Sequence, residues 1–194
     1  MPALIATQVI QAYQMGAFPM ADESGEIAWF SPDPRCIIPL DGLRVSRSLR
    51  RTIRRGIFDI RVNSDFDAVI AECADRPEGT WISTEIMDLY RTLHRRGYAH
   101  SVEAWSDEKL VGGLYGVAIG GAFFGESMFT RVTDASKVAL AALVERMSRR
   151  GYVLLDTQWS TSHLESMGAI EISRREYLRR LRLALPLPGL FADV

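Results

Sequence analysis

Lysine is nearly absent from this chain, and cysteine and histidine are scarce. Only Lys109 and Lys137 stand among the 23 basic residues, so the other 21 are arginines. The two cysteines and three histidines do not lie at the spacing of metal ligands, and two thiols are too few for a disulfide framework. We therefore expect no metal site, and we expect Cys36 and Cys73 to be reduced, buried thiols.

Long apolar runs and an N-terminal leader pattern are missing as well. No stretch of about 18 uncharged apolar residues occurs, and the N-terminal residues lack a basic region followed by an apolar one. We therefore expect a cytoplasmic protein without membrane contact. With 194 residues, 47% of them hydrophobic and 24% charged, the chain is expected to form one main domain and a small additional lobe.

Arginines gather in one segment of the chain. Seven occur between Arg44 and Arg61, and a helix over residues 46–55 would place five of them on one stripe, opposite Leu49 and Ile53. The members of this arginine stripe are Arg47, Arg50, Arg51, Arg54 and Arg55. Such a stripe is typical of contacts to phosphates, while an ordinary solvated helix face explains it equally well.

The N-terminal part reads as a small lobe. Apolar spacing predicts a helix from Ile5 to Met15 that ends at Gly16. Three prolines between Trp29 and Pro39 exclude a central strand before Cys36. This segment marks the join between a lobe of residues 1–33 and a main domain of residues 34–194.

The rest of the chain alternates between strand and helix patterns. Three consecutive strand runs predict an antiparallel meander, and an apolar helix with Asp134 as its N-cap follows them. The ending from Pro186 is expected to be a frayed tail. This order indicates an α/β (α+β) fold with a mixed, largely antiparallel sheet that splays at a cleft, and an acetyltransferase-like fold fits it. The expected strands are 58–63, 100–105, 110–119, 121–129, 152–157 and 169–172, and the expected helices are 66–73, 84–96, 135–149, 160–167 and 174–183.

Polar residues interrupt two of the expected strands. Glu126 stands in the run Gly-Ala-Phe-Phe-Gly-Glu-Ser-Met-Phe, where a carboxylate needs a partner, a substrate or a raised pKa to compensate its lost hydration. Asp156 and Gln158 are two residues apart, so a strand presents both on one face and Thr157 on the other. Taken alone, Glu126 could be the partner of an arginine, and the Asp156–Gln158 pair is more typical of a buried hydrogen-bonding link than of a reaction centre.

Four segments closely resemble the leucyl/phenylalanyl-tRNA–protein transferases of bacteria, and the similarity extends over about residues 13–181. The resemblance implies a short-form member with an acetyltransferase-like (GNAT-type) domain behind a small N-terminal lobe. It implies an enzyme that moves leucine, phenylalanine and, less well, methionine from aminoacyl-tRNA to the α-amino group of proteins that begin with Arg or Lys. Such transfer marks the acceptor for degradation in the N-degron pathway, and it needs no cofactor or metal. The segments are Trp29-Phe-Ser-Pro-Asp-Pro-Arg35, Gly79-Thr-Trp-Ile82, Gly121 to Lys137 and Leu154-Leu-Asp-Thr-Gln158.

The resemblance also implies roles for single residues. Gln158 would orient the attacking amine, while Asp156 would hold Gln158 and take up developing positive charge. Glu126 would face the amino group of the donor or the basic end of the acceptor, and the arginine stripe would contact the tRNA. The implied walls of the pocket for the transferred side chain are Leu114, Met128, Leu140, Leu143 and Met147.

Trp81 would, by the same resemblance, stack on the 3′-terminal adenosine of the donor, since a base stacked on an aromatic ring gains ~1–3 kcal/mol. A second tryptophan of the family, directly after Phe-Pro, is replaced here by Met20. Trp29 or Phe30 would then compensate for it. The family also has serine and asparagine where Thr130 and Asp134 stand, and usually cysteine in place of Thr157, whose side chain is expected to point away from the site.

Two other classes of function are weighed against this one. A coenzyme A-dependent N-acetyltransferase needs a glycine-containing loop that cradles a pyrophosphate at the start of the crossover helix. Residues 131–137 contain no glycine, and Asp134 would repel a phosphate. A non-catalytic RNA- or peptide-binding module would have no need for the pair Asp156 and Gln158.

Overall fold

The structure, a computed structural model, describes residues 6–21, 26–77 and 79–192. Its strands are β1 Phe18–Ala21, β2 Ile27–Phe30, β3 Arg35–Ile38, β4 Asp59–Val62, β5 Ala99–Ser106, β6 Lys109–Ile119, β7 Ala122–Thr130, β8 Leu154–Gln158 and β9 Ile170–Ile172. Seven of them form one sheet in the order β4-β5-β6-β7-β8-β3-β9. Its pairs are antiparallel except β7 with β8, which are parallel. The fold is therefore mixed α/β with a mostly antiparallel sheet.

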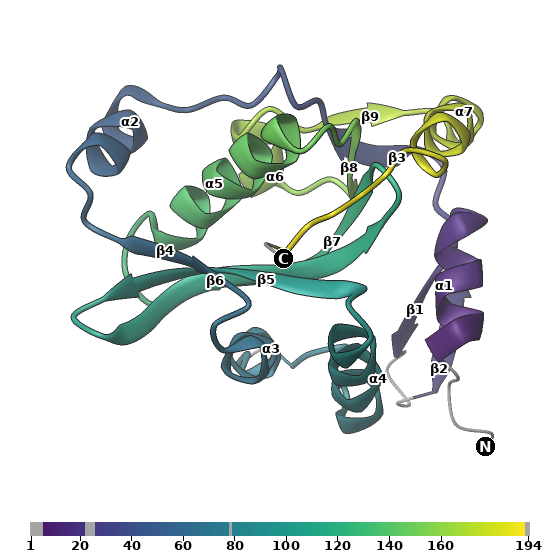
Figure 1. The fold of residues 1–194 in the computed structure, drawn as a ribbon, viewed down its shortest axis with the longest axis horizontal. Coiled ribbons are helices and arrows are strands. Elements are labelled where there is room, and N and C mark those ends of the chain that lie inside the picture. Colours follow the sequence, from purple (N-terminus) through teal and green to yellow (C-terminus); the bar gives the residue numbers. More distant parts are fainter. Residues whose placement is uncertain (1–5, 22–25, 78, 193–194) are drawn as a thin grey trace.

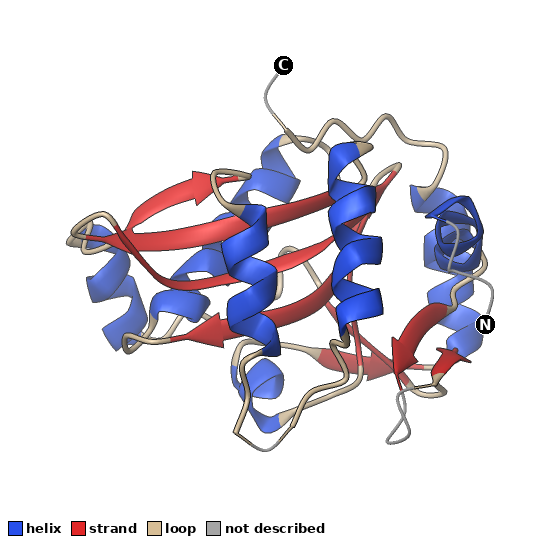
Figure 2. Ribbon diagram, turned by 90° about the horizontal axis from the view of Figure 1, so that it is seen from below, coloured by secondary structure: helices blue, strands red, loops and turns tan. Residues whose placement is uncertain are grey.

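Helices cover both faces of this sheet, as Figure 1 shows. They are α1 Ala6–Gln14, α2 Arg47–Arg54, α3 Phe66–Ala74, α4 Thr84–Arg95, α5 Ala135–Arg149, α6 Ser162–Ser166 and α7 Arg174–Ala184. Helix α5 packs on one face, while α3 and α4 pack on the other, where Figure 2 shows them in front of the strands. One apolar core joins α1, α3, α4 and α7 to the sheet, and a second joins α2 and α5 to its opposite face.

The strands and helices expected from Phe58 onward are confirmed, with ends that shift by no more than two residues. The expected helix at the N-terminus is confirmed as α1, although Ile5 lies outside the described residues. Side chains cap most helix starts, because a hydroxyl or carboxylate accepts a hydrogen bond from a free backbone N–H there. These caps are Ser46, Asp65, Ser83, Thr161 and Ser173.

Helix α5 is the crossover that makes β7 and β8 parallel. Asp134 stands at its N-cap position, but the expectation that its side chain caps the helix is wrong. The backbone of Asp134 is left-handed, with φ of 70°, and its carboxylate accepts a hydrogen bond from Thr52 Oγ1 at 3.4 Å and lies 3.5 Å from Lys137 Nζ. Those contacts replace the cap.

One short strand pair and one further strand in the N-terminal part were not expected. Strands β1 and β2 form an antiparallel hairpin beside the main sheet, with Phe18 opposite Phe30. Strand β3 begins at Arg35, one residue before the limit that the prolines suggested, and it lies inside the sheet between β8 and β9. Pro34 thus directly precedes the strand and Pro39 directly follows it, and neither interrupts its pairing in the sheet. The division into residues 1–33 and 34–194 stays a prediction.

The chain ending is packed against the second core, so the expected frayed tail is wrong for the described residues. Phe191 is only 2% exposed and contacts the rings of Phe123 and His100. Arg146 holds the backbone, because its Nε donates to the carbonyl of Phe191 at 2.7 Å. A single aromatic residue amid prolines and glycine gave no periodic signal, and this is why the pattern suggested a free end.

A shift in the pairing register between β6 and β7 lies next to Glu126. The pairing of β6 with β7 shifts between Tyr115 and Gly116, so that Gly116 lies opposite Gly125, next to Glu126. A side chain at Gly116 would overlap the carbonyl oxygen of Phe124 and the ring of Phe123. Glycine is therefore needed there for the close approach of β7.

Candidate active site

A cavity of about 1070 Å³ opens where β7 and β8 part. The two strands pair only as far as Phe124 with Asp156, so the residues beyond that pair border open space. The cavity has an aromatic end and an aliphatic end, with Glu126 and Gln158 in its wall. Phe18 and Trp81 of the aromatic end pack with the first core, Trp159 contacts Phe18, and Met20 lies on the same strand as Phe18. The aliphatic end belongs to the second core and contains Leu114, Met128, Leu140, Leu143, Leu155 and Leu164.

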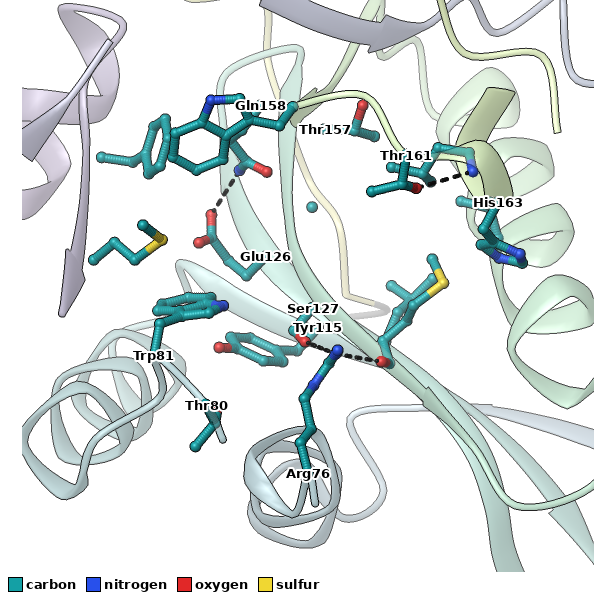
Figure 3. A pocket seen from close by; sticks show the side chains of 18 of the residues that line it. Arg76, Thr80, Trp81, Tyr115, Glu126, Ser127, Thr157, Gln158, Thr161 and His163 are labelled. Carbon is teal, nitrogen blue, oxygen red and sulfur yellow. Dashed lines mark hydrogen bonds between the residues drawn. The ribbon is translucent and has the colours of Figure 1, made fainter. Parts of the chain in front are cut away.

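Glu126 is held by three side chains. Tyr13 donates its hydroxyl to Oε1 and Tyr90 donates its hydroxyl to Oε2, both at 2.8 Å. Gln158 Nε2 lies 3.3 Å from Oε1 and donates to it (Figure 3). The two tyrosine hydroxyls are also 2.6 Å apart. Because both tyrosines are fully buried and near Glu126, their pKa values are raised well above the usual range, so they stay protonated donors.

The carboxyl group of Glu126 has an unusual protonation equilibrium. Burial raises its pKa to about 7, against the opposing effect of the hydrogen bonds from Tyr90 and Tyr13. The charge of Asp156 also raises this pKa, and Arg35 lowers it. A carboxyl group that titrates near neutral pH can accept or release a proton under physiological conditions. The expectation of a hydrogen-bonded or pKa-shifted carboxylate at Glu126 is thus confirmed, and its partners are tyrosines and Gln158 instead of an arginine.

Asp156 lies behind the cavity wall, and its side chain is completely buried. Arg35 donates two hydrogen bonds to Asp156, from Nε to Oδ1 at 2.9 Å and from Nη2 to Oδ2 at 2.6 Å. Tyr177 donates its hydroxyl to Oδ2 at 2.8 Å, and the backbone N–H of Gln158 donates to Oδ1 at 3.0 Å. Both oxygens of Asp156 are therefore occupied by protein groups, and Asp156 does not line the cavity.

Gln158 leaves the strand geometry. Its φ is 58°, in the left-handed region that a residue with a side chain adopts only when its surroundings enforce it. The hydrogen bond from its N–H to Asp156 is part of that enforcement. Since the simple alternation of side chains ends here, Gln158 reaches Glu126 while Asp156 stays behind the wall. The expectation that Thr157 points away from the site is wrong, because Thr157 lines the cavity, as Leu155 does on the same strand face.

The residues expected around the transferred side chain are mostly brought together. Leu114 from β6, Met128 from β7 and Leu140 and Leu143 from α5 line one continuous wall. Met147 lies one turn further along α5 and is fully buried in the second core, outside the cavity lining. The wall is apolar and contains no charged side chain among these members, so it suits an uncharged, apolar group.

Of the aromatic residues expected at the donor base, only Trp81 lines the cavity. Trp29 is 45% exposed on β2, and Phe30 packs on Phe18 and Trp159 without lining the cavity. Trp159 lines the cavity, although the sequence patterns did not single it out. The sequence signal that could have pointed to Trp159 is its position as a large aromatic residue directly after Asp156-Thr-Gln158.

The arginine stripe lies on the exposed side of α2. Leu49 buries the opposite side of this helix, and Ile53 is 39% exposed. None of the five stripe arginines forms an ion pair with a carboxylate in the described part of the chain. The charges are thus available to an outside partner. The stripe consists of Arg47, Arg50, Arg51, Arg54 and Arg55.

Three further features concern metal ions, membranes and thiols. Within residues 6–21, 26–77 and 79–192, no three His, Cys, Asp or Glu side chains are grouped so that they could hold a metal ion. The same residues include no helix with the length and apolar character needed to cross a membrane. Cys36 and Cys73 are free and buried, as expected.

Comparison with known proteins agrees with the resemblance seen in the sequence. Residues 37–182 match the family described as leucyl/phenylalanyl-tRNA protein transferase, and residues 4–33 match the N-terminal domain described for the same family. A leucyl/phenylalanyl-tRNA–protein transferase of Rubrobacter xylanophilus is 56% identical over 185 residues, which are 95% of this chain and 96% of that protein. Another, of a Ruegeria species, is 55% identical over 190 residues, which are 97% of this chain and 90% of that protein.

Among solved structures, L-PGS from Bacillus licheniformis is similar with a TM-score of 0.44 and 14% sequence identity, over 91% of this chain and 62% of that one. The family match and the two relatives, which extend over nearly the whole chain at more than half identity, decide the assignment. The chain belongs to the leucyl/phenylalanyl-tRNA–protein transferase family.

Proposed function

We propose that this protein transfers leucine, phenylalanine and, less well, methionine from aminoacyl-tRNA to the N-terminal α-amino group of proteins that begin with Arg or Lys. The observation that carries the proposal is the Glu126–Gln158 pair in the wall of one cavity, between an aromatic and an aliphatic end. The aliphatic end suits the transferred side chain, and the aromatic end suits the nucleoside that carries it. The Glu126–Gln158 pair lies between these two ends, where the ester bond of the donor would react.

The reaction needs alignment more than activation. The donor is an ester, so attack of the acceptor amine on its carbonyl carbon forms a C–N bond and breaks the C–O bond to the ribose. The ribose oxygen takes up a proton in exchange for the one that the amine loses, and it leaves as a hydroxyl. An α-amino group has a pKa of about 8 and is partly a free base at neutral pH. Holding the amine near the carbonyl therefore supplies a large share of the acceleration.

Glu126 and Gln158 are the side chains that we assign to the reacting atoms. An amide oxygen is a hydrogen-bond acceptor with little basicity, so Gln158 orients the attacking amine. Glu126, with its pKa near 7, takes the proton that the amine loses and stabilises the positive charge that develops before this transfer. Asp156 acts through Gln158, because its oxygens are bound to Arg35, Tyr177 and the Gln158 backbone.

The aliphatic end explains the preference for unbranched or γ-branched side chains. Met128 can adapt its shape to leucine, phenylalanine or methionine, whereas a β-branched side chain such as valine is stiff at the carbon next to the backbone. Leu140 and Leu143 complete this wall from α5.

Helix α5 also bears on the acetyltransferase alternative. We propose that residues 34–194 form a GNAT-type domain, a view that the meander, the crossover helix α5 and the parallel pair β7–β8 support. The N-terminus of α5 carries Asp134, and residues 131–137 contain no glycine, which disfavours a bound pyrophosphate. We therefore place aminoacyl transfer before coenzyme A chemistry. The proposed substrates imply that the protein acts in the cytoplasm and marks its acceptors for degradation.

The proposed function is tested with leucyl-, phenylalanyl- and valyl-tRNA and a peptide that begins with arginine. We expect the first two donors to add one residue to the peptide, as read by mass, and valyl-tRNA to react far more slowly. A matched peptide that begins with glutamate serves as the control acceptor and should remain unmodified. Equal transfer from all three donors, or to both peptides, would contradict the proposal.

The arginine stripe yields a separate prediction. Replacing Arg47, Arg51 and Arg54 by glutamate should weaken binding of donor tRNA and reduce the slope of log affinity against log salt by roughly one unit per lost phosphate contact. Transfer from a minimal aminoacyl-adenosine donor should change little, because that donor has no tRNA body. Filter binding at several salt concentrations measures the slope. Equal loss with both donors would show that the stripe supports the fold instead of binding RNA.

A further inference from the structure

Trp159 occupies a special position in the cavity. It directly follows Gln158, lines the same cavity as Trp81, and is 40% exposed. Its ring packs nearly at right angles on Phe18, with centroids 5.0 Å apart and an interplanar angle of 84°. A second contact of this kind, to Phe30, has a centroid distance of 5.8 Å and an angle of 68°. These contacts fix the plane of the indole while much of its surface stays uncovered by protein.

The surroundings of Trp159 differ chemically from the other end of the cavity. Phe18, Met20 and Trp81 line the cavity together with Trp159, and they come from β1 and from the segment before α4. Figure 3 shows Trp81 on one side of the Glu126–Gln158 pair, with His163 on the opposite side of the cavity. Phe18 and Trp81 pack with the first core, whereas the aliphatic wall belongs to the second core on the opposite face of the sheet.

The proposed function places a base near these residues. In an aminoacyl-tRNA the ester is attached to the ribose of the terminal adenosine, so the adenine is only one sugar ring away from the carbonyl that reacts. When that carbonyl lies at Glu126 and Gln158, the base must lie about one sugar ring away from them. Aromatic rings are the side chains on which bases stack, and a methionine thioether packs well against ring edges.

We propose that Trp159 is a specificity-determining residue that, together with Trp81, binds the terminal adenine of the donor tRNA. This inference rests on the proposed function and assigns a contact within it. Trp159 and Trp81 supply the aromatic surfaces, and Met20 lines the same cavity. A second aromatic surface for the base thus comes from the end of β8, whereas the sequence suggested Trp29 or Phe30.

Trp29 provides a matched control within the same chain. It is 45% exposed, similar to Trp159, and belongs to β2, where it pairs with Pro19. It does not line the cavity. Replacing either tryptophan removes an exposed indole, but only the replacement of Trp159 should affect a bound base.

The test uses direct binding of two probes. The first is 3′-leucylamido-3′-deoxyadenosine, an amide analogue that cannot be turned over, and the second is the same leucylamido ribose without the base. We expect Trp159→Leu to weaken binding of the adenosine probe roughly 5- to 100-fold, the range that corresponds to one stacked base. Trp159→Phe should retain most of the affinity, and Trp29→Leu all of it. Trp159→Leu and the wild type should bind the baseless probe equally.

Two outcomes would overturn the assignment. Unchanged affinity of Trp159→Leu for the adenosine probe is one, and an equal loss for both probes is the other, since that would show a general effect on the cavity. Circular dichroism and thermal unfolding establish that each variant is folded. If the leucine variant does not fold, Trp159→Met, whose flexible side chain can still pack on Phe18 and Phe30, takes its place.

Failure of the proposed function would be recognised separately. In that case the wild-type protein would not transfer leucine from leucyl-tRNA to the arginine peptide, whatever the variants do. The binding comparison with the two probes would still decide whether Trp159 contacts the adenine.

Discussion

Replacement of Arg35 by methionine is expected to lower the free energy of unfolding by about 3–5 kcal/mol, because it leaves the carboxylate of Asp156 buried without its cation. Both side chains of this pair are at most 1% exposed, so water cannot compensate the loss. Arg35 Nη1 also donates to the carbonyl of Gly16 at 3.0 Å, and this bond is lost too. Urea unfolding at pH 7 measures the effect.

A double variant separates the structural role of this pair from a chemical one. Arg35→Met combined with Asp156→Asn removes both charges, while the side-chain oxygen of Asn can still accept a hydrogen bond from the N–H of Gln158. We expect it to regain most of the lost stability, and transfer per folded molecule to stay within about tenfold of the wild type, since a positioning role needs the bond but not the charge.

The surface supplies the matched control for this prediction. Arg61 is 29% exposed and pairs with the exposed carboxylates of Asp59 and Glu108, so Arg61→Met should change the free energy of unfolding by no more than about 1 kcal/mol. If Arg35→Met lowers the free energy of unfolding by no more than Arg61→Met does, the buried pair of Arg35 and Asp156 does not have the structural role argued for it. A double variant that is stable but transfers over a hundredfold more slowly would show that Asp156 takes part in the reaction through its charge.

Glu126→Gln is expected to slow transfer by roughly 10²–10⁴-fold, the usual contribution of a positioned acid or base. In the wild type, kcat/KM should rise with pH through about 7, the pKa to which burial raises this carboxyl group, because the ionised form accepts the proton of the amine. The variant should lack this rise and retain only the later one that belongs to the acceptor amine. Initial rates between pH 5.5 and 9 at low acceptor concentration measure both profiles.

The same pKa shift has a consequence for stability. The folded protein holds the proton on Glu126 up to about pH 7, whereas an unfolded chain releases it near pH 4.5. The folded state therefore binds more protons between these values, and stability falls as pH rises through this window, by at most ~3 kcal/mol. Glu126→Gln should remove this fall, so that the variant gains relative stability above pH 7.

Glu103 on β5 offers the control for a buried carboxyl group outside the site. It is fully buried and accepts hydrogen bonds from Ser101 and Trp105, and it does not line the cavity. Glu103→Gln should keep the rise of kcat/KM near pH 7. If Glu126→Gln keeps this rise as well, another group is the base.

Much of the fold followed from local patterns. The meander of β5, β6 and β7 and the apolar helix α5 have clear periodicity, so their positions could be predicted from the sequence. The hairpin of β1 and β2 could not, because its strands are four residues long and each contains few alternating positions. The packing of Phe191 depends on contacts with residues far away in sequence, and no local pattern encodes them.

Site residues could be predicted from the sequence where a polar side chain stands among apolar neighbours. Glu126 stands out as a carboxylate among aromatics, and Gln158 as an amide at the end of an apolar strand. Arg35 did not stand out, since it is one arginine among 21, and its partner Asp156 lies 121 positions away. Tyr13 and Tyr90 read as ordinary core residues, and only the fold brings their hydroxyls to Glu126.

The parting of β7 and β8 keeps two properties of this protein independent. Glu126 and Gln158 are carried by the two backbones on either side of the gap, so the distance between them is set by the course of the strands. Leu140 and Leu143 reach the cavity from α5, a separate element. Substitutions on that helix can enlarge or reduce the room for the transferred side chain without moving the reacting pair. A lineage can therefore change its choice of amino acid in small steps while its chemistry stays intact.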